Sequence, residues 1–268
     1  MQKVRKLVLP VAGLGKRLRP LTLRKPKALV PLNGGPLLEY VLKEAVESGI
    51  REVVLVISPQ HLDSFKKYIK ERGAGFKNLK FHIRFQDRPV GNGHAVVQAA
   101  SIVGKEPFAV RFCDDLIVDK PPVLSSLIKF YEAYRASVLL LERVPKKRVS
   151  RYGVVGIKRV AKKSSGLPHG NLFQITEIIE KPKLSLAPSN LTIVGGYVLT
   201  PTIMRNLIKI VNSLPVAGID ALPVALALQV ELIIGGRVFG WEFTGKRLDC
   251  GTLDSLREAE EFLKNNKY

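Results

Sequence analysis

The sequence predicts an α/β protein with a doubly wound sheet and a smaller β-rich part in its second half. Short apolar or β-branched segments alternate with helical patterns up to about residue 135, which is typical of βαβ units. Beyond about residue 140, strand-like segments follow one another with little helix between them. A chain of 268 residues can bury one substantial core. We therefore expect a single domain, 1–268, with halves at about 1–135 and 136–268.

Hydrophobic periodicity defines the elements of the first half. An apolar run predicts a buried strand over 6–12, and apolar residues at helical spacing predict a helix over 37–46 that Gly49 ends. The following patterns predict a strand over 53–57, a helix over 61–72, a strand over 79–85, a short helix over 94–103 and a buried strand over 108–113. In such sheets, ligands lie at the carboxyl ends of the strands.

The second half is predicted to be richer in strands. Apolar and β-branched segments predict strands over 137–142, 152–157, 172–179 and 192–199, with a Ser-, Gly- and Pro-containing loop over 162–171. Helical patterns follow over 202–213 and 219–227. A late strand over 238–243 and an amphipathic helix over 252–265 complete the prediction.

The composition limits the kind of partner. Lysine and arginine exceed aspartate and glutamate by 43 to 23, a net charge of +20, which raises nucleic acid as a partner. The positive residues are spread along the chain and are not interleaved with aromatic residues, so we expect an anionic substrate and no nucleic acid. No apolar stretch approaches the roughly 20 residues that span a bilayer, so we expect no membrane partner. Two cysteines cannot form a disulfide framework and suit a reducing cytoplasm.

The densest basic segment follows the first predicted strand. Gly13 and Gly15 open it, and six cations lie in the twelve residues from Lys16 to Lys27. Glycine lets backbone N–H groups approach phosphate oxygens, while lysine or arginine supplies the counter-charge. A dinucleotide fingerprint would need a third glycine at Leu18, and a P-loop would need serine or threonine at Arg17. The segment is thus predicted to be a phosphate loop of another kind; a solvated basic face is the alternative.

Two consecutive carboxylates follow the buried strand over 108–113. Asp114 and Asp115 lie where that strand leaves the predicted sheet. Carboxylates beside a polyphosphate site commonly hold Mg²⁺, a hard cation that prefers oxygen ligands. Aspartate is also frequent in turns and helix caps, so from this pattern alone both interpretations stand.

Several motifs in order along the chain resemble those of the sugar-1-phosphate nucleotidylyltransferases, especially the bacterial-type UTP–glucose-1-phosphate uridylyltransferases. They are Gly13–Arg17 with Pro26–Pro31, Gln86 with Gly91–Ala95, Tyr152–Val155, Glu180–Pro182 with Ala187–Tyr197, and Arg247–Thr252. The resemblance runs from Val8 to the closing helix. It implies a Rossmann-like mixed sheet of the nucleotide-diphospho-sugar transferase type, with a smaller β-rich sugar-binding part, and we expect a homo-oligomer.

The resemblance also implies roles for individual residues. Asp114 and Asp249 would share one Mg²⁺, with Asp115 less certain because family members vary there. Arg17, Lys27 and Lys181 would be catalytic, through the charge that they place on the phosphates. The implied nucleotide-binding residues are Ala12, Gly13, Gly15, Gln86 and Gly91, and the implied sugar-binding residues are Gly153, Glu180 and Val194.

The implied reaction is the transfer of a uridylyl group from UTP to glucose 1-phosphate, which gives UDP-glucose and pyrophosphate. It would proceed by in-line attack of the sugar phosphate on the α-phosphorus, without a protein nucleophile. Three alternatives stay open: a thymidylyltransferase that uses dTTP, towards which Pro26–Pro31 leans; a non-catalytic homologue that binds a nucleotide sugar; and a nucleic-acid-binding protein.

Both cysteines adjoin a proposed metal ligand, Cys113 before Asp114 and Cys250 after Asp249. Neighbouring side chains on a strand point to opposite faces, so aspartates that face a metal would leave both thiols facing the core. We therefore predict that neither thiol is catalytic.

Overall fold

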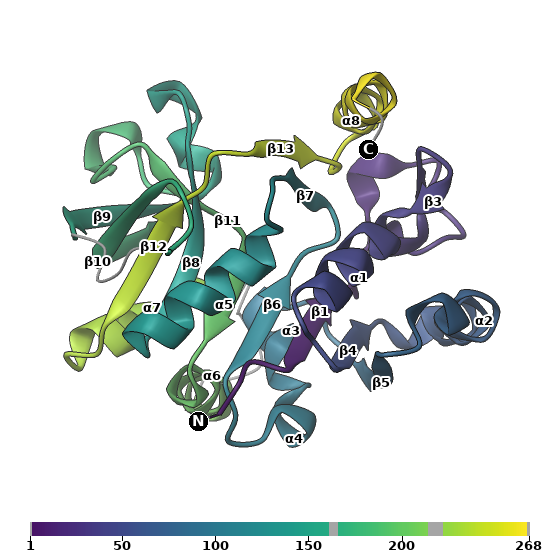
Figure 1. Cartoon of the computed structure of the whole chain (residues 1–268), viewed down its shortest axis with the longest axis horizontal. Coiled ribbons are helices and arrows are strands. Elements are labelled where there is room, and N and C mark those ends of the chain that lie inside the picture. Colours follow the sequence, from purple (N-terminus) through teal and green to yellow (C-terminus); the bar gives the residue numbers. More distant parts are fainter. Residues whose placement is uncertain (1, 161–165, 214–221, 267–268) are drawn as a thin grey trace.

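A computed structural model describes residues 2–160, 166–213 and 222–266. Within these residues, one nine-stranded sheet runs through the molecule (Figure 1). Its strands, in spatial order, are β5 (Lys80–Phe85), β4 (Glu52–Ile57), β1 (Lys6–Pro10), β6 (Phe108–Arg111), β11 (Leu191–Leu199), β8 (Ser137–Arg143), β12 (Val238–Glu242), β10 (Asn171–Glu180) and β9 (Gly153–Arg159).

The first half of the sheet is parallel. β1 pairs in parallel with both β4 and β6, and β4 pairs in parallel with β5. The chain thus proceeds outward from β1 in one direction to β4 and β5, and later in the other direction to β6. The gap between the carboxyl ends of β1 and β6 is therefore a topological switch point, where ligands bind in open α/β sheets.

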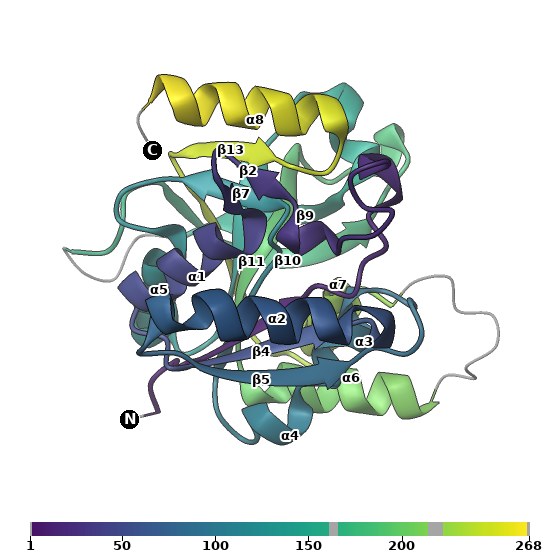
Figure 2. The ribbon, with the colours of Figure 1, turned by 90° about the vertical axis from the view of Figure 1, so that its right-hand side faces the viewer.

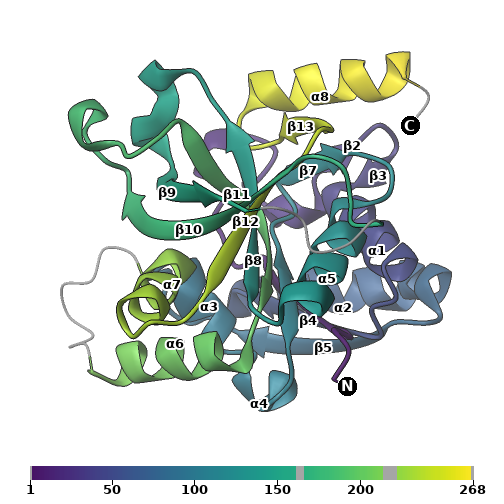
Figure 3. The same cartoon turned by 60° about the vertical axis from the view of Figure 1, so that its left-hand side comes forward.

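The second half is mostly antiparallel. β11 pairs antiparallel with β6 and β8, and so joins the two halves into one sheet. β10 pairs antiparallel with β9 and β12, while β12 lies parallel to β8 (Figure 3). The predicted α/β class, with a mixed sheet and a β-rich second part, is confirmed.

Helices cover both faces of the sheet (Figures 1 and 2). α1 (Leu37–Glu47), α2 (Leu62–Arg72) and α5 (Val123–Tyr134) contribute to one apolar core, through residues such as Leu38, Phe65 and Phe130. α3 (Asn92–Val97), α4 (Ala100–Val103), α6 (Pro201–Ser213) and α7 (Val224–Ile233) contribute to or pack against the other. Among the described residues, none of the helices is both long and apolar enough to cross a membrane.

A separate two-stranded sheet lies beside the main one. Its strands, β7 (Asp115–Val118) and β13 (Lys246–Asp249), pair antiparallel with Asp249 opposite Asp115. α8 (Leu253–Asn265) lies over this pair (Figure 2). A short hairpin, β2 (Pro31–Leu32) and β3 (Gly35–Pro36), leads into α1. This arrangement brings the late segment around Asp249 to the end of β6.

The structure departs from the sequence expectations at a few elements. The helix expected over 94–103 is divided into α3 and α4. The helix expected over 219–227 begins at Val224, after the extended Pro223, and continues to Ile233; positions 219–221 lie outside the described residues. Part of the loop expected over 162–171 also lies outside them. β2, β3, β7, α5 and β13 have no counterpart among the predicted elements.

Candidate active site

The glycine loop follows β1 at the switch point. Gly15 has a φ of 58°, and a Cβ there would lie 2.9 Å from Thr22 Cγ2, so a side chain at this position would be strained. The Thr22 hydroxyl donates to the Gly15 carbonyl at 2.8 Å. A short 3-10 helix, Lys16–Leu18, begins immediately afterwards, with Leu18 fully buried. The anchored Leu18 leaves the side chains of Lys16 and Arg17 exposed on the loop.

This loop forms one wall of a cavity of about 290 Å³. Its lining includes Gly13, Gly15 and three cations, Lys16, Arg17 and Lys27, together with Asp114 and Gly251. The structure therefore brings most of the predicted phosphate loop to one cavity, and three cations line that cavity. Ala12 is buried behind the loop, outside this lining.

Asp114 and Asp249 approach this cavity from two parts of the chain. The Cys250 N–H donates to the Asp114 carbonyl at 2.8 Å, and the Gly251 N–H donates to Asp249 Oδ1 at 2.8 Å. A Cβ on Gly251 would lie 2.8 Å from Asp249 Oδ1 and 3.1 Å from Arg17 Nη2. Asp249 lies outside the lining of this cavity but is near Arg17, which lines it. A metal shared by Asp114 and Asp249 stays a prediction.

The donor set fits a magnesium ion held together with phosphates. Both side chains offer carboxylate oxygens, and Mg²⁺ is usually bound by one or two carboxylates plus substrate oxygens. Among the described residues, no group of three or more His, Cys, Asp or Glu side chains could hold a metal alone. The Lys27 ammonium forms an ion pair with Asp114 Oδ2, so one of the two carboxylates already has a positively charged partner.

Asp115 is engaged differently. Its carboxylate accepts from the Gly195 N–H at 2.6 Å and from Arg247 Nε, and the residue is 8% exposed. Because both oxygens have protein donors, Asp115 holds the backbone of β11 in place. The structure thus separates two consecutive carboxylates into one at the cation-lined cavity and one in a structural network.

A second cavity, of about 180 Å³, begins on the Asp115 side. Glu180, Gly153, Val194 and Tyr152 line it together with Asp115. Gly153 is opposite Glu180 in the β9–β10 pair, and a Cβ on Gly153 would lie 3.0 Å from Glu180 Oε2. The three predicted sugar-binding residues therefore share one cavity, and the exposed Glu180 carboxylate faces a glycine.

Lys181 lies beyond the lining of both cavities. The residue has a φ of 47° and an exposed side chain, and its N–H donates to the Tyr152 carbonyl at 3.0 Å. The backbone bond fixes where the side chain begins, next to the cavity that contains Glu180. The assignment of Lys181 to the sugar phosphate remains a proposal.

Gln86 and Gly91 lie together at the start of α3. Gln86 is 8% exposed, and its amide nitrogen donates to the Gly91 carbonyl at 2.9 Å and lies 3.3 Å from His94 Nδ1. Gly91 has a φ of 99°, and a Cβ there would lie 2.5 Å from the Leu222 nitrogen. The packing of Leu222 therefore requires glycine at this position even without a ligand, and base binding here remains a proposal.

The structure reveals site residues that the sequence analysis did not single out. Arg247 lines the second cavity and Lys16 lines the first. The signal for Arg247 was present, because it lies two residues before Asp249 on a strand and therefore on the same face. Arg111, which is 1% exposed and bonded to Glu44 at 3.0 Å, gave no such signal.

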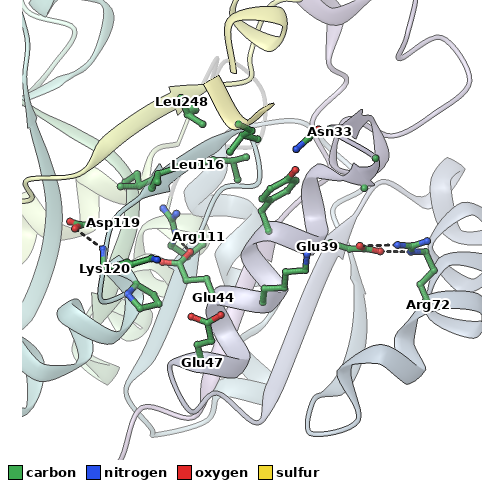
Figure 4. Close-up of a pocket in the computed structure, with 18 residues that line it drawn as sticks. Asn33, Glu39, Glu44, Glu47, Arg72, Arg111, Leu116, Asp119, Lys120 and Leu248 are labelled. Atoms are coloured by element: carbon green, nitrogen blue, oxygen red, sulfur yellow. Dashed lines mark hydrogen bonds and ion pairs between the residues drawn. The ribbon is translucent and has the colours of Figure 1, made fainter. Parts of the chain in front are cut away.

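A third cavity, of about 550 Å³, lies beside α1 (Figure 4). Four of its eight charged side chains form two ion pairs, Glu39 with Arg72 and Glu44 with Arg111. The cavity is larger than the two described above, but it contains none of the predicted site residues. Arg111 connects this cavity to the second one, because its Nη1 donates to the carbonyl of Gly195 at 2.7 Å and Gly195 lines the second cavity.

Both thiols are buried, as predicted. Cys113 is 4% and Cys250 0% exposed, although Cys113 also forms part of the floor of the cation-lined cavity. Burial, reinforced by nearby aspartates, raises the pKa of each thiol to about 12. The nucleophilic thiolate is therefore scarce at neutral pH.

We expect Cys113→Ala and Cys250→Ala to retain near-normal turnover, with a loss of stability of about 1–2 kcal/mol each from the small cavity left behind. Steady-state rates and denaturant titrations would measure both effects. Rapid alkylation of the native protein with immediate loss of turnover, blocked by a nucleotide and Mg²⁺, would contradict this expectation.

A glycine loop at the switch point of a doubly wound sheet, with two carboxylates beside it, defines a nucleotide-binding α/β protein. The chain belongs to the nucleotidyl transferase family, whose profile matches residues 6–266. This membership confirms the resemblance on which the residue roles were based.

Individual relatives are similar over almost their whole length. A UTP–glucose-1-phosphate uridylyltransferase from Bacillus subtilis (strain 168) is 34% identical, with 100% of this chain and 94% of the relative aligned. The crystal structure of a UDP-glucose pyrophosphorylase complexed with UDP-glucose matches with a TM-score of 0.85 and 29% identity, covering 98% of this chain and 99% of that one. A UTP-bound UGPase from Acinetobacter baumannii matches with a TM-score of 0.79 and 29% identity, covering 97% and 94%.

Proposed function

We propose that the protein transfers a uridylyl group from UTP to glucose 1-phosphate and releases pyrophosphate. This proposal rests on one observation: two consecutive residues, Asp114 and Asp115, line two different cavities. Asp114 lines the cavity with the glycine loop and three cations, whereas Asp115 lines the cavity that contains Glu180. A nucleotide in the first and a sugar phosphate in the second would meet at this peptide. The similar proteins named above bear the names of this reaction and of its substrates.

The nucleotide phosphates would bind the glycine loop. The Gly13–Gly15 amides and the exposed Arg17 would receive the β- and γ-phosphates, which would leave as pyrophosphate. Lys27, at the floor of the same cavity, would stabilise charge that gathers at the α-phosphorus. Such catalysis consists of positioning and charge neutralisation, and it needs no protein nucleophile.

We propose Mg²⁺ as the metal, held by Asp114 and Asp249. When bound, it would neutralise charge on the α-phosphate and on the attacking sugar phosphate. The Lys27 ammonium pairs with the Asp114 carboxylate in the structure. With metal and substrate bound, it would interact with the substrate phosphates instead.

The sugar would occupy the cavity of Glu180, Gly153 and Val194, with its phosphate towards Lys181. We expect Glu180→Ala to raise the KM for glucose 1-phosphate about tenfold, the equivalent of ~1.4 kcal/mol, and to leave the KM for UTP near its original value. The reason is that Glu180 faces Gly153 and is not among the residues that line the cation-lined cavity. Initial-rate kinetics with each substrate varied would test this, and an equal loss for both substrates would count against the assigned sugar position.

The base would lie near Gln86 and Gly91. An amide carries both a donor and an acceptor and can pair with a pyrimidine edge. We expect Gln86→Ala to raise the KM for UTP more than that for the sugar phosphate and to relax the choice between UTP and dTTP. Competition between the two nucleotides in one reaction, followed by product analysis, would measure the preference; an unchanged ratio would remove Gln86 from base recognition.

The experiment that tests the proposed function directly is pyrophosphate release from UTP or dTTP against a panel of sugar 1-phosphates. We expect the highest kcat/KM with UTP and glucose 1-phosphate. Higher efficiency with dTTP would favour the thymidylyltransferase alternative, and binding of UDP-glucose without turnover of any pair would favour a non-catalytic homologue.

Three further assignments belong to the same proposal. The halves 1–135 and 136–268 would bind nucleotide and sugar, respectively. The protein would act as a homo-oligomer, which light scattering can test. The two buried cysteines, both unpaired in the structure, support a reducing compartment such as the cytoplasm.

A further inference from the structure

A largely buried arginine, Arg247, lies in the wall of the sugar cavity. Arg247 Nε donates to Asp115 Oδ1, and Arg247 Nη1 donates to Glu142 Oε2 at 2.8 Å. The guanidinium carbon lies 5.5 Å from the centre of the Tyr152 ring. Arg247 therefore contacts three segments that are each far from it in sequence, at β7, at β8 and just before β9.

The connection extends to the backbone that lines the cavity. Asp115 Oδ2 accepts from the Gly195 N–H at 2.6 Å, and Arg111 Nη1 donates to the Gly195 carbonyl at 2.7 Å. Gly195 lies where the β11–β8 register shifts between Ile193 and Tyr197. A Cβ there would lie 2.8 Å from Phe112 and 2.9 Å from Asp115 Oδ2. Both backbone polar groups of Gly195, its N–H and its carbonyl, are thus held by buried side chains at an irregular point of the strand.

The charges around Arg247 indicate what it does not do. One guanidinium faces two carboxylates, and its side chain is 12% exposed. Its positive charge is therefore already compensated by the protein, whereas Lys16 and Arg17 are exposed beside the glycine loop. A compensated cation contributes little to binding a sugar phosphate by charge. The planar fork of its donors, in contrast, can fix the geometry of several segments at once.

We propose that Arg247 is a positioning residue for the hexose pocket and thereby sets the affinity for the sugar phosphate. It fixes Asp115, Glu142 and Tyr152 directly. Through Asp115 it also fixes Gly195. This inference rests on the proposed function, because it assigns the cavity of Glu180 to the hexose. It predicts that changes at Arg247 alter the KM for the sugar phosphate and not the KM for UTP. It also predicts that the planar guanidinium donors are required, and that a positive charge alone is not sufficient.

The test is Arg247→Lys, which keeps the charge and loses the fork. We expect the KM for glucose 1-phosphate to rise about ten- to hundredfold, as for a small displacement of a substrate-positioning group. The KM for UTP should stay within about twofold, because the nucleotide cavity is lined by other residues. Arg143→Lys is the matched control: Arg143 Nε donates to Glu242 at 2.8 Å, but the side chain is 49% exposed. Both KM values should stay unchanged in that variant.

Glu142→Gln is a second test variant, to be used if Arg247→Lys does not fold. This substitution retains the shape and weakens only the Nη1 contact, and it should raise the same KM by a smaller factor. A melting temperature that falls while both KM values stay unchanged would reduce Arg247 to a structural role and overturn the proposal. A similar rise in both KM values would do the same. If the wild-type protein itself does not turn over UTP and glucose 1-phosphate, the proposed function fails instead.

Discussion

Asp114→Asn and Asp249→Asn are each expected to lower kcat by about 10³-fold, the equivalent of ~4 kcal/mol, while the protein stays folded. Each change would remove one of the two proposed charged ligands from a cation that prefers carboxylate oxygens. The fold should persist, because neither residue belongs to the buried set: Asp114 is partly exposed and paired with Lys27, and Asp249 keeps an acceptor oxygen for the Gly251 N–H.

The measurement is turnover as a function of Mg²⁺ concentration, with circular dichroism to verify the fold. Asp254→Asn is a suitable control, because Asp254 lies on α8, is 89% exposed and pairs with Arg257; it should keep full activity. If both site variants retained wild-type rates at limiting Mg²⁺, the assignment of a shared metal would be wrong.

Lys27→Met is expected to have two opposite effects. Turnover should fall by about 10²- to 10³-fold, as when one preorganised donor at a developing charge is removed. The affinity of the nucleotide-free protein for a divalent cation should instead rise, because the Lys27 ammonium competes for Asp114 Oδ2. A residue that merely supported the metal site would lower both quantities.

Binding of Mn²⁺ to the nucleotide-free protein, followed by electron paramagnetic resonance, measures the second effect without turnover. Lys25→Met serves as the control, since Lys25 belongs to the same basic segment but is exposed and lies outside the cavity lining. Unchanged or weaker Mn²⁺ binding in Lys27→Met would contradict the competition between lysine and metal.

Local sequence signals were sufficient for the nucleotide side of the site. Gly13, Gly15 and Asp114 each follow a buried strand, and the parallel order of β1 and β6 brings such strand ends together. The closing segment at Asp249 was located by the family resemblance, and its pairing with β7 explains how it reaches Asp114. The fold class likewise followed from the alternation of strand and helix patterns, which depends on short-range periodicity.

The sequence could not show how neighbouring residues divide their roles. Asp114 and Asp115 differ because Gly195 and Arg247, 80 and 132 positions away, bond to the second carboxylate alone. Gly91 suggested close approach of a base, yet the nearest backbone atom belongs to Leu222. Both facts arise from long-range packing, for which a local pattern carries no signal.

The overlooked helix has a different cause. Val123–Tyr134 carries buried residues at helical spacing, so its pattern was readable. Two prolines, Pro121 and Pro122, precede it, and no element was predicted for this segment. In the structure, Pro122 is the N-cap of the helix, a place at which the missing N–H of proline costs no helical hydrogen bond.

We propose a single in-line transfer of a uridylyl group at the junction of the two cavities. The stereochemistry at phosphorus tests this transfer directly, with a single stereoisomer of UTP that carries sulfur in place of one oxygen on the α-phosphorus. Phosphorus-31 NMR of the product with glucose 1-phosphate and Mg²⁺ would report the configuration. We expect a thio-analogue of UDP-glucose with inverted configuration at the α-phosphorus. Retention would require a covalent intermediate on the protein, and the absence of any uridylyl product would contradict the transfer itself.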